Sequence, residues 1–308
     1  MKILVTGGAG FIGSHIVDDL VANGCQVVVV DDLSTGSQYN VNPEARLYPM
    51  SIADPRLTEV FAAESPEMVS HHAAQVNLRR SVDEPQYDAE VNIVGSLNVI
   101  VNSTRHGVRR FVYASSGGAI YGEPQYLPVD EAHPVNPASQ YGLSKHTVER
   151  YLRLYAREGL EYVTLRYANV YGPRQNPVGE AGVVAIFAGQ MLRGERPTIF
   201  GPGNKTRDYT HVSDVVEAHR LALEQGHNTA YNIGTATETS DQEVFDAVAR
   251  ALDYRDAPLF AAVRPGEIHR MCLDATRARH ELGWEPKVSL SQGIAGTVTY
   301  YKSQGMAR

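Results

Sequence analysis

A glycine-rich turn joins the first strand-like run of the chain directly to its first amphipathic segment. Residues 2–6 are mostly apolar, and Gly7, Gly10 and Gly13 follow at three-residue spacing. Glycine is needed in such a turn because the backbone bends sharply, a diphosphate must approach bare backbone, and the next helix must pack closely on the strand. The first amides of that helix and its partial positive charge then favour a phosphate. The pattern predicts a parallel α/β sheet with a dinucleotide site after its first strand.

An acidic pair closes the next strand-like run, residues 26–31. Asp31 follows Gly13 by 18 residues, which is the distance at which an acid bonds the ribose 2′-hydroxyl in such sheets. Asp31 and Asp32 would repel a 2′-phosphate, and residues 31–40 contain no Arg or Lys to neutralise one. The pattern therefore favours NAD over NADP. The alternative is that these acids only cap the next turn.

Strand-like and helical patterns alternate through the first half of the chain, which is typical of a parallel sheet covered by helices on both faces. We expect strands at residues 2–6, 26–31, 46–48, 68–71, 110–114 and 162–166, and helices near 12–22, 57–63, 86–106 and 139–158. Further helices are expected near 182–192, 212–224, 241–252 and 276–282. The prediction is a Rossmann-type doubly wound α/β sheet over residues 1–168, with part of 208–234 returning to it. A smaller α/β substrate domain then spans 169–308.

Composition and charge exclude several classes of partner. The 308 residues are 43% apolar and carry a net charge of −7 without a long basic run, so nothing favours nucleic acid. No segment approaches the roughly 20 apolar residues that span a bilayer, and no secretory signal peptide is visible. Cys25 and Cys272 have neither metal nor redox spacing, and His71 and His72 lack further ligands nearby. We expect a cytoplasmic protein without membrane, nucleic-acid or metal partners.

A Tyr-Lys pair lies near the start of the helical pattern at 139–158. The spacing of four residues puts Tyr141 and Lys145 on one helical face, where the ammonium can favour the phenolate. A tyrosine titrates near 10 when unperturbed, so it needs such help to act as a base near neutral pH. The pair is a candidate catalytic dyad, and the alternative is an ordinary exposed pair on a helix surface.

The ordered motifs of the chain resemble the extended short-chain dehydrogenase/reductases over almost the whole length. The motifs are Val5–Gly13, Asp31–Gly36, His71–Ala74, Asn92, Ser115–Gly122, Tyr141 with Lys145, Leu165–Arg174, Arg207–Tyr209 and Arg264–Glu267. Within that family the chain is most similar to the nucleotide-sugar epimerases, in particular those that act at C4 of UDP-glucose. The resemblance implies interconversion of UDP-galactose and UDP-glucose by transient oxidation at sugar C4, with tightly bound NAD as cofactor.

The resemblance also implies three catalytic groups. Tyr141 would take the proton of the sugar 4-hydroxyl, while Lys145 would lower the pKa of Tyr141 and hold the nicotinamide ribose. The third group is a Ser or Thr in the family, but its position is Gly117 in this chain. We therefore expect Ser116 to replace it, with Ser115 beside it. The alternative is that both serines only cap loop backbone.

Cofactor contacts are implied in the same way. Phe11 and Ile12 would offer their amides to the diphosphate, and the Asp-Ile pair that binds adenine in the family appears here as Ser51 and Ile52, without the charge. The complete expected set is Gly7, Gly10, Phe11, Ile12, Gly13, Asp31, Asp32, Ser34, Thr35, Gly36, Ser51, Ile52, His72, Ala73, Ala74, Gln75, Asn92, Ser115, Tyr141, Lys145, Tyr167 and Ala168.

The substrate contacts implied by the resemblance come mainly from the second half, together with Ser116 and Tyr141. Two guanidiniums can clamp a diphosphate, although without the resemblance these arginines would be solvated surface residues. Asn169, Arg207 and Arg264 would bind the UDP diphosphate, Glu267 the uridine ribose, Ile199 and Phe200 the uracil through their backbone, and Met271 would lie near sugar C2. Methionine is neither a large blocking aromatic nor a small residue, so acceptance of an N-acetyl group stays open.

Other activities share this scaffold. The dehydratases and decarboxylases of the family carry acids where this chain has Gly118 and Ala119, so elimination is disfavoured. A 4-keto reductase, or an epimerase of UDP-N-acetylglucosamine or UDP-glucuronate, stays open. A non-catalytic NAD-binding sensor would not need Tyr141 and Lys145 together.

Two apolar stripes suggest self-association. Relatives pair the corresponding helices into a four-helix bundle, which predicts a homodimer, whereas the alternative is that the stripes face the protein's own core. The stripes are Ile93, Leu97, Ile100 and Val101, followed by Val148, Tyr151, Leu152 and Tyr155.

Overall fold

The computed structural model describes residues 1–178, 182–264 and 267–305. Within these residues the centre is a seven-stranded parallel sheet in the order β11-β6-β5-β4-β1-β2-β3. Its strands are β1 (Lys2–Thr6), β2 (Gln26–Asp31), β3 (Arg46–Pro49), β4 (Met68–His71), β5 (Arg110–Ser116), β6 (Glu161–Tyr167) and β11 (Thr229–Ile233). The strand order reverses between β1 and β4, and open α/β sheets bind ligands beyond the carboxyl ends of the strands at such a reversal.

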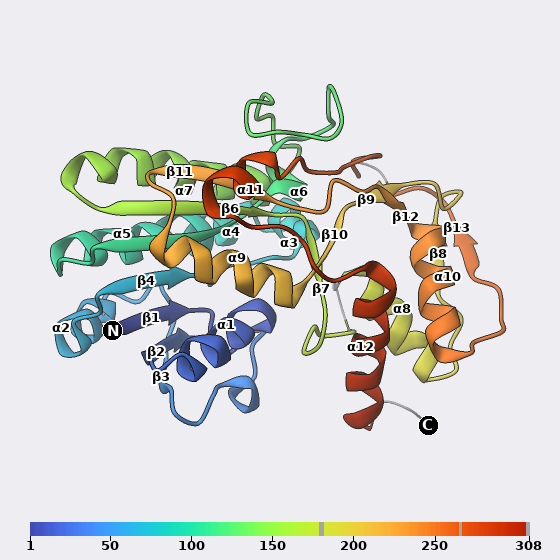
Figure 1. Cartoon of the computed structure of the whole chain (residues 1–308), viewed down its shortest axis with the longest axis horizontal. Coiled ribbons are helices and arrows are strands. Elements are labelled where there is room, and N and C mark those ends of the chain that lie inside the picture. Colours follow the sequence, from blue (N-terminus) through green and yellow to red (C-terminus); the bar gives the residue numbers. More distant parts are fainter. Residues whose placement is uncertain (179–181, 265–266, 306–308) are drawn as a thin grey trace.

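Helices cover both faces of this sheet, which confirms the predicted doubly wound fold (Figure 1). One face carries α1 (Phe11–Ala22) and α9 (Val212–Glu224), which contact each other. The other face carries α2 (Leu57–Glu64), α5 (Ser96–Arg105) and α7 (Gln140–Tyr155).

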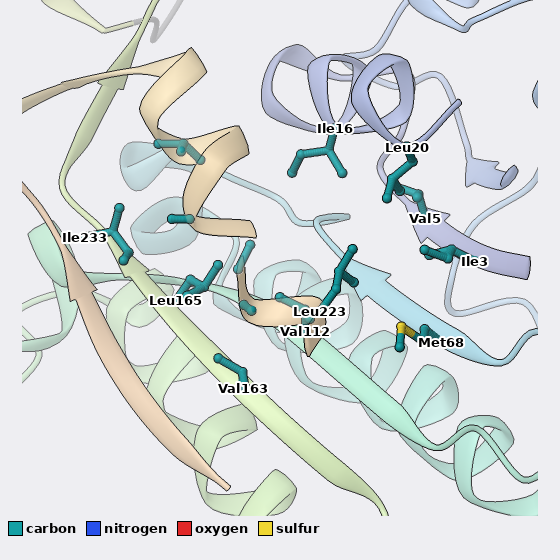
Figure 2. Close-up of a cluster of buried hydrophobic side chains, with 14 of the residues drawn as sticks. Ile3, Val5, Ile16, Leu20, Met68, Val112, Val163, Leu165, Leu223 and Ile233 are labelled. Carbon is teal, nitrogen blue, oxygen red and sulfur yellow. The ribbon is translucent and has the colours of Figure 1, made fainter. Parts of the chain in front are cut away.

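The two faces of the sheet form two separate apolar cores because successive side chains of a strand point to opposite sides. Val5 packs in one core with Ile16 and Leu20 of α1 (Figure 2). The neighbouring Leu4 belongs instead to the core that contains Phe61 of α2. Burial on both faces accounts for the continuous apolar runs in the sequence, since such strands have no solvent side.

A smaller group of elements lies at one end of the molecule (Figure 1). Here α8, α10 and α12 pack against one another around an apolar core of their own. The bounds are α8 (Val183–Leu192), α10 (Asp241–Leu252), α12 (Leu290–Ser303), and the strand pairs β7 (Asn169–Tyr171) with β10 (Tyr209–His211), β9 (Thr206–Arg207) with β12 (Thr239–Ser240), and β8 (Thr198–Phe200) with β13 (Leu259–Ala261). Two elements from the second half of the chain belong to the main sheet and its helices instead. Strand β11 pairs with β6, and α9 packs on α1.

The helix expected at 86–106 is divided. The structure has α4 (Pro85–Ala89), a π-helical turn η2 (Glu90–Gly95) and then α5. The wide turn lets the Asn92 side chain bond both the amide and the carbonyl of Gln75, which a continuous α-helix would not position in the same way. Elements that the sequence did not predict include α3 (Leu78–Asp83), α6 (Gly117–Ile120), α12 and β11, whereas the expected helix at 276–282 is α11 (Thr276–Leu282).

The residues of the two apolar stripes are all buried or partly buried. Ile100, Val148 and Leu152 lie in the protein's own core, as the alternative interpretation held. Two other leucines of α7, Leu143 and Leu154, belong to neither stripe and are more than half exposed. Among the described residues, no helix has the length and apolar character that crossing a bilayer requires.

Candidate active site

The glycine turn after β1 brings three backbone segments into contact. Gly7 has a φ of +70°, and a Cβ there would lie 2.6 Å from the Ala73 nitrogen. A Cβ on Gly13 would lie 2.1 Å from the Gly7 oxygen. Helix α1 follows at Phe11, and in the described part of the chain no side chain caps it. Its first amides, including those of Phe11 and Ile12, are therefore available to a diphosphate lying over bare backbone, so the residues present fit a dinucleotide.

The two acids after β2 have different partners. Asp31 is buried and accepts the amides of Ala9 at 2.9 Å and Leu33 at 2.8 Å. Burial raises the pKa of Asp31, and the two amide bonds oppose this shift. Asp32 instead accepts both the amide and the hydroxyl of Ser34. Asp32 thus caps the next turn, as the alternative interpretation suggested, while Asp31 stands at the glycine turn.

The loop after β4 is held by hydrogen bonds to the first strand and to η2. The amide of Ala73 donates to the Thr6 hydroxyl at 3.2 Å, and Gln75 and Asn92 bond each other twice. The His72 ring stacks on Tyr167 at the end of β6, with ring centroids 6.4 Å apart. These contacts bring several expected cofactor residues together at the carboxyl ends of neighbouring strands.

Other expected cofactor residues border the same region of the chain. Gly36 packs so closely on the glycine turn that a Cβ would lie 2.8 Å from the Ala9 carbonyl carbon. Ser51 accepts the Ala53 amide through its hydroxyl, and Ile52 is buried beneath it. Thr35 lies in the loop after β2, Ala74 in the loop after β4, and Ala168 directly after β6.

The Tyr141 hydroxyl lies at the start of α7, within hydrogen-bond reach of Ser116. Lys145 follows one turn later, fully enclosed, and its Nζ donates to the Ala114 carbonyl at 2.9 Å. That Nζ is 5.8 Å from the centre of the Tyr141 ring. Burial raises the pKa of Tyr141 to about 12, and the hydrogen bond from Ser116 opposes this shift. Burial also lowers the pKa of Lys145 to about 8, against the attraction of Asp88 and Glu149.

The two serines at the end of β5 point to different partners. The Ser115 hydroxyl is buried and donates to Glu149 at 2.6 Å, whereas Ser116 meets Tyr141. A side chain at the following position would displace Leu273, because a Cβ on Gly117 would lie 2.4 Å from Cδ1 of Leu273. Of the two serines, Ser116 alone reaches the Tyr141 hydroxyl within the described structure, and Ser115 serves to bond α7.

Glu149 was missed by the sequence reasoning, although a signal was present. It lies four residues after Lys145 and eight after Tyr141, so all three share one helical face. Its carboxylate is paired with Arg166 of β6 through two N–H donors at 3.0 and 2.7 Å. Burial raises the pKa of Glu149, but the hydrogen bonds of His146, Arg166 and Ser115 outweigh it and hold that pKa at about 2.

Segments from the second half of the chain converge on the loop after β5. The Asn169 side chain lies 3.4 Å from the place of a Cβ on Gly118. The His269 amide donates to Glu123 at 2.9 Å, and Arg207 donates to the Ile268 carbonyl at 2.7 Å. These contacts place Arg207 and Asn169 on segments that adjoin the Ser116 loop.

The remaining expected substrate residues fall in two places. The guanidinium of Arg264 covers the Phe200 ring at 3.4 Å, and Glu267 accepts a hydrogen bond from Lys205 at 2.6 Å. Ile199, in the same strand as Phe200, is buried. Met271 is also buried, in a small apolar cluster that includes Leu273. Pro265 and Gly266, which complete the predicted Arg264–Glu267 motif, lie outside the described residues.

The chain matches a known family over most of its length. A model described as the NAD dependent epimerase/dehydratase family matches residues 3–234. The UDP-glucose 4-epimerase of Mycolicibacterium smegmatis is 45% identical over 311 residues, covering 99% of each chain. The solved UDP-glucose 4-epimerase of Thermotoga maritima with UDP-glucose gives a TM-score of 0.97 at 48% identity and covers 99% of each chain. That of Thermus thermophilus with NAD gives 0.93 at 44% identity and covers 98% of this chain and 99% of its own.

The chain therefore belongs to the NAD dependent epimerase/dehydratase family. Its cofactor is NAD, and the glycine turn with Asp31 at its side is consistent with that cofactor. The family, the Rossmann-type fold and the cofactor predicted from the sequence are thereby confirmed.

Proposed function

We propose that the chain is a UDP-glucose 4-epimerase, which interconverts UDP-galactose and UDP-glucose. The observation that carries this proposal is the grouping of Ser116, Tyr141 and Lys145 at the carboxyl end of β5. These three groups can handle a proton at one hydroxyl beside a dinucleotide site. Full-length relatives with this activity at 44–48% identity support the choice of UDP-glucose over other sugars.

The side chains divide the chemistry at sugar C4 among them. Tyr141, as the phenolate, accepts the proton of the 4-hydroxyl. It returns this proton after the sugar has rotated to present its other face. Ser116 donates a hydrogen bond to the oxygen of the 4-hydroxyl and thereby aligns that hydroxyl with Tyr141. The Lys145 ammonium favours the phenolate electrostatically and bonds the nicotinamide ribose.

The cofactor is held by the first half of the chain. When bound, NAD would take the C4 hydride and return it to the opposite face of the sugar, so the cycle is redox-neutral and the cofactor stays in place. The amides of Phe11 and Ile12 hold its diphosphate and Asp31 its adenosine ribose. Residues 1–168 with part of 208–234 thus form the NAD-binding domain, and residues 169–308 form the domain that binds the nucleotide sugar.

The nucleotide of the substrate is held by charged side chains of the second half. Arg207 and Arg264 clamp the UDP diphosphate with Asn169, and Glu267 receives the uridine ribose. Arg264 leaves the face of Phe200 to do so, since its guanidinium covers that ring in the free protein. Met271, whose side chain is buried in the cluster that includes Leu273, would lie near sugar C2.

We further propose that the enzyme is a cytoplasmic homodimer without nucleic-acid or membrane partners. Cys25 and Cys272 are both free, which suits a reducing compartment. The exposed Leu143 and Leu154 on α7 offer an apolar surface to a second copy.

The activity is tested with purified protein and UDP-galactose, without added cofactor. We expect UDP-glucose to form, because NAD remains bound through each cycle. Tyr141→Phe should reduce turnover by about 100-fold or more, since it removes the acid-base group. Tyr155→Phe, on the same helix but away from Lys145, is the matched control and should retain activity.

Three outcomes would redirect the proposal. Conversion of UDP-N-acetylgalactosamine or UDP-glucuronate alone would change the substrate. Net reduction that consumes added NADH would indicate a 4-keto reductase. Full activity of Tyr141→Phe would overturn the assignment of the base.

A further inference from the structure

A second buried carboxylate lies against the start of α7. Asp88 of α4 is only 1% exposed, and three donors converge on it. The Gln75 and Asn92 side-chain amides donate to Oδ1 at 3.0 and 2.9 Å, and the Ser144 hydroxyl donates to Oδ2 at 2.7 Å. The carboxylate therefore ties the loop after β4 and the turn η2 to the residue that precedes Lys145.

Asp88 differs from the other buried carboxylate near this lysine. Glu149 is neutralised by the Arg166 guanidinium at 2.7 Å. The partners of Asp88 in the described structure are all uncharged, and no ion pair there includes it. Its negative charge is therefore not cancelled by a contact, and it acts through a low-dielectric interior on nearby cations.

Lys145 is the cation that this charge reaches. The groups that face Lys145 are Tyr141 and Glu149 from α7, Asp88 from α4, Tyr113 from β5, and His71 and His72 from the end of β4. Burial lowers the pKa of both histidines, so they are neutral near pH 7. With Glu149 paired, Asp88 is the uncompensated negative group of this set.

We propose that Asp88 is a positioning residue for the epimerase, one that keeps the Lys145 side chain cationic and fixes the first turn of α7 against the loop of Gln75. The importance of this role for catalysis depends on the proposed function. The charge effect on Lys145 can be measured without any turnover.

The sign of the effect follows from the direction of each shift. The Asp88 charge raises the pKa of Lys145 and also raises that of Tyr141. Removing the charge lowers both pKa values. The two limbs of a pH–rate profile, which report the protons of Lys145 and Tyr141, should therefore both move to lower pH.

Asp88→Asn removes the charge and keeps the shape. Its amide oxygen can accept from Gln75 and Asn92, and its NH2 can donate to the Ser144 hydroxyl, which serves equally as donor or acceptor. Two matched variants separate charge from structure. Ser144→Ala removes one hydrogen bond to Asp88 but leaves the charge, whereas Asp83→Asn removes an equal charge from an exposed site on α3.

The direct measurement is the titration of Lys145 by NMR of protein labelled at the lysine ε-carbon. The chain has five lysines, so the signals are few, and Lys145→Arg identifies the one of interest. We expect the Lys145 midpoint to fall by about one pH unit in Asp88→Asn. It should stay in place in Ser144→Ala and in Asp83→Asn.

The pH profile of kcat/KM for UDP-galactose is the second readout. Both limbs should move to lower pH in Asp88→Asn, with a loss of activity at pH 8 that shrinks as the pH is lowered. An unchanged Lys145 midpoint in a folded Asp88→Asn protein would overturn the proposal. If the wild-type protein converts no UDP-galactose while the midpoint still shifts, the proposed function fails and the role of Asp88 toward Lys145 stands.

Discussion

Individual residues explain why one candidate serine is favoured over its neighbour. The family pattern places the third catalytic group at Gly117, and from the sequence we expect Ser116 to replace it, with Ser115 beside it. The structure gives the physical reason for the glycine, because Leu273 occupies the space that any side chain at that position would need. The sequence could not reveal this, since Leu273 is distant in the chain and arrives through tertiary packing alone.

Two buried histidines make stability depend on pH. Both ring nitrogens of His71 lie within hydrogen-bond distance of hydroxyls, Thr6 at 2.6 Å and Ser96 at 2.9 Å, and His219 meets Ser70 at 2.7 Å. Burial lowers the pKa of each histidine to about 3. Below the ordinary value near 6.5 the unfolded chain binds protons that the native protein does not, so each histidine removes up to about 1.4 kcal/mol of stability per pH unit.

The free energy of unfolding in urea should therefore fall as the pH is lowered from 7.5 to 5. This pH range avoids the contribution of Glu149 to stability. The pKa of that carboxyl is about 2 in the folded state, so its contribution changes only below about pH 5. His219→Gln should flatten the slope, because it removes one of the buried histidines whose pKa is lowered. An equal slope in His219→Gln and the parent would contradict this account.

Among the elements, helices that are rich in local signals were predicted almost to the residue. Helix α10 begins with a capping box formed by Ser240 and Glu243, which can be recognised from four residues of sequence. Helix α12 was missed although Ser289 and Gln292 form the same motif. Gly293 inside it weakens the helical pattern, yet the glycine is needed because a Cβ there would lie 2.2 Å from the Tyr171 hydroxyl.

The short helix α6 and the Leu273 segment should be energetically coupled. Gly117→Ala forces a new methyl against Leu273 and should cost about 1–3 kcal/mol of unfolding free energy. Leu273→Ala leaves a cavity in the cluster around Met271 and should cost about 2–5 kcal/mol.

The double variant should lose less than the sum of the two, because the smaller residue at 273 accepts the new methyl. Urea unfolding of the three proteins measures the coupling. Strict additivity would show that the two segments do not press on each other in solution.

At the scale of the whole molecule, the exposed face of α7 carries the prediction of a dimer. Leu143 is 55% exposed and Leu154 is 51% exposed, and their spacing of 11 residues, about three helical turns, puts both on one side of α7. Light scattering at micromolar concentration should give twice the chain mass of 33.7 kDa. Leu143→Glu together with Leu154→Glu should give the monomer mass with an unchanged circular dichroism spectrum. A monomeric parent protein would contradict the prediction.

The return of β11 to the main sheet has a consequence for synthesis of the chain. While a ribosome has released only the residues up to the end of β6, the flank of β6 that β11 will pair with has no neighbour, and the apolar side chains that will meet α9 are open to solvent. Such an intermediate exposes both an unpaired strand edge and a hydrophobic surface. A gene fragment ending at residue 168 should therefore yield insoluble protein, and supplying residues 169–308 as a second polypeptide in the same cell should restore solubility.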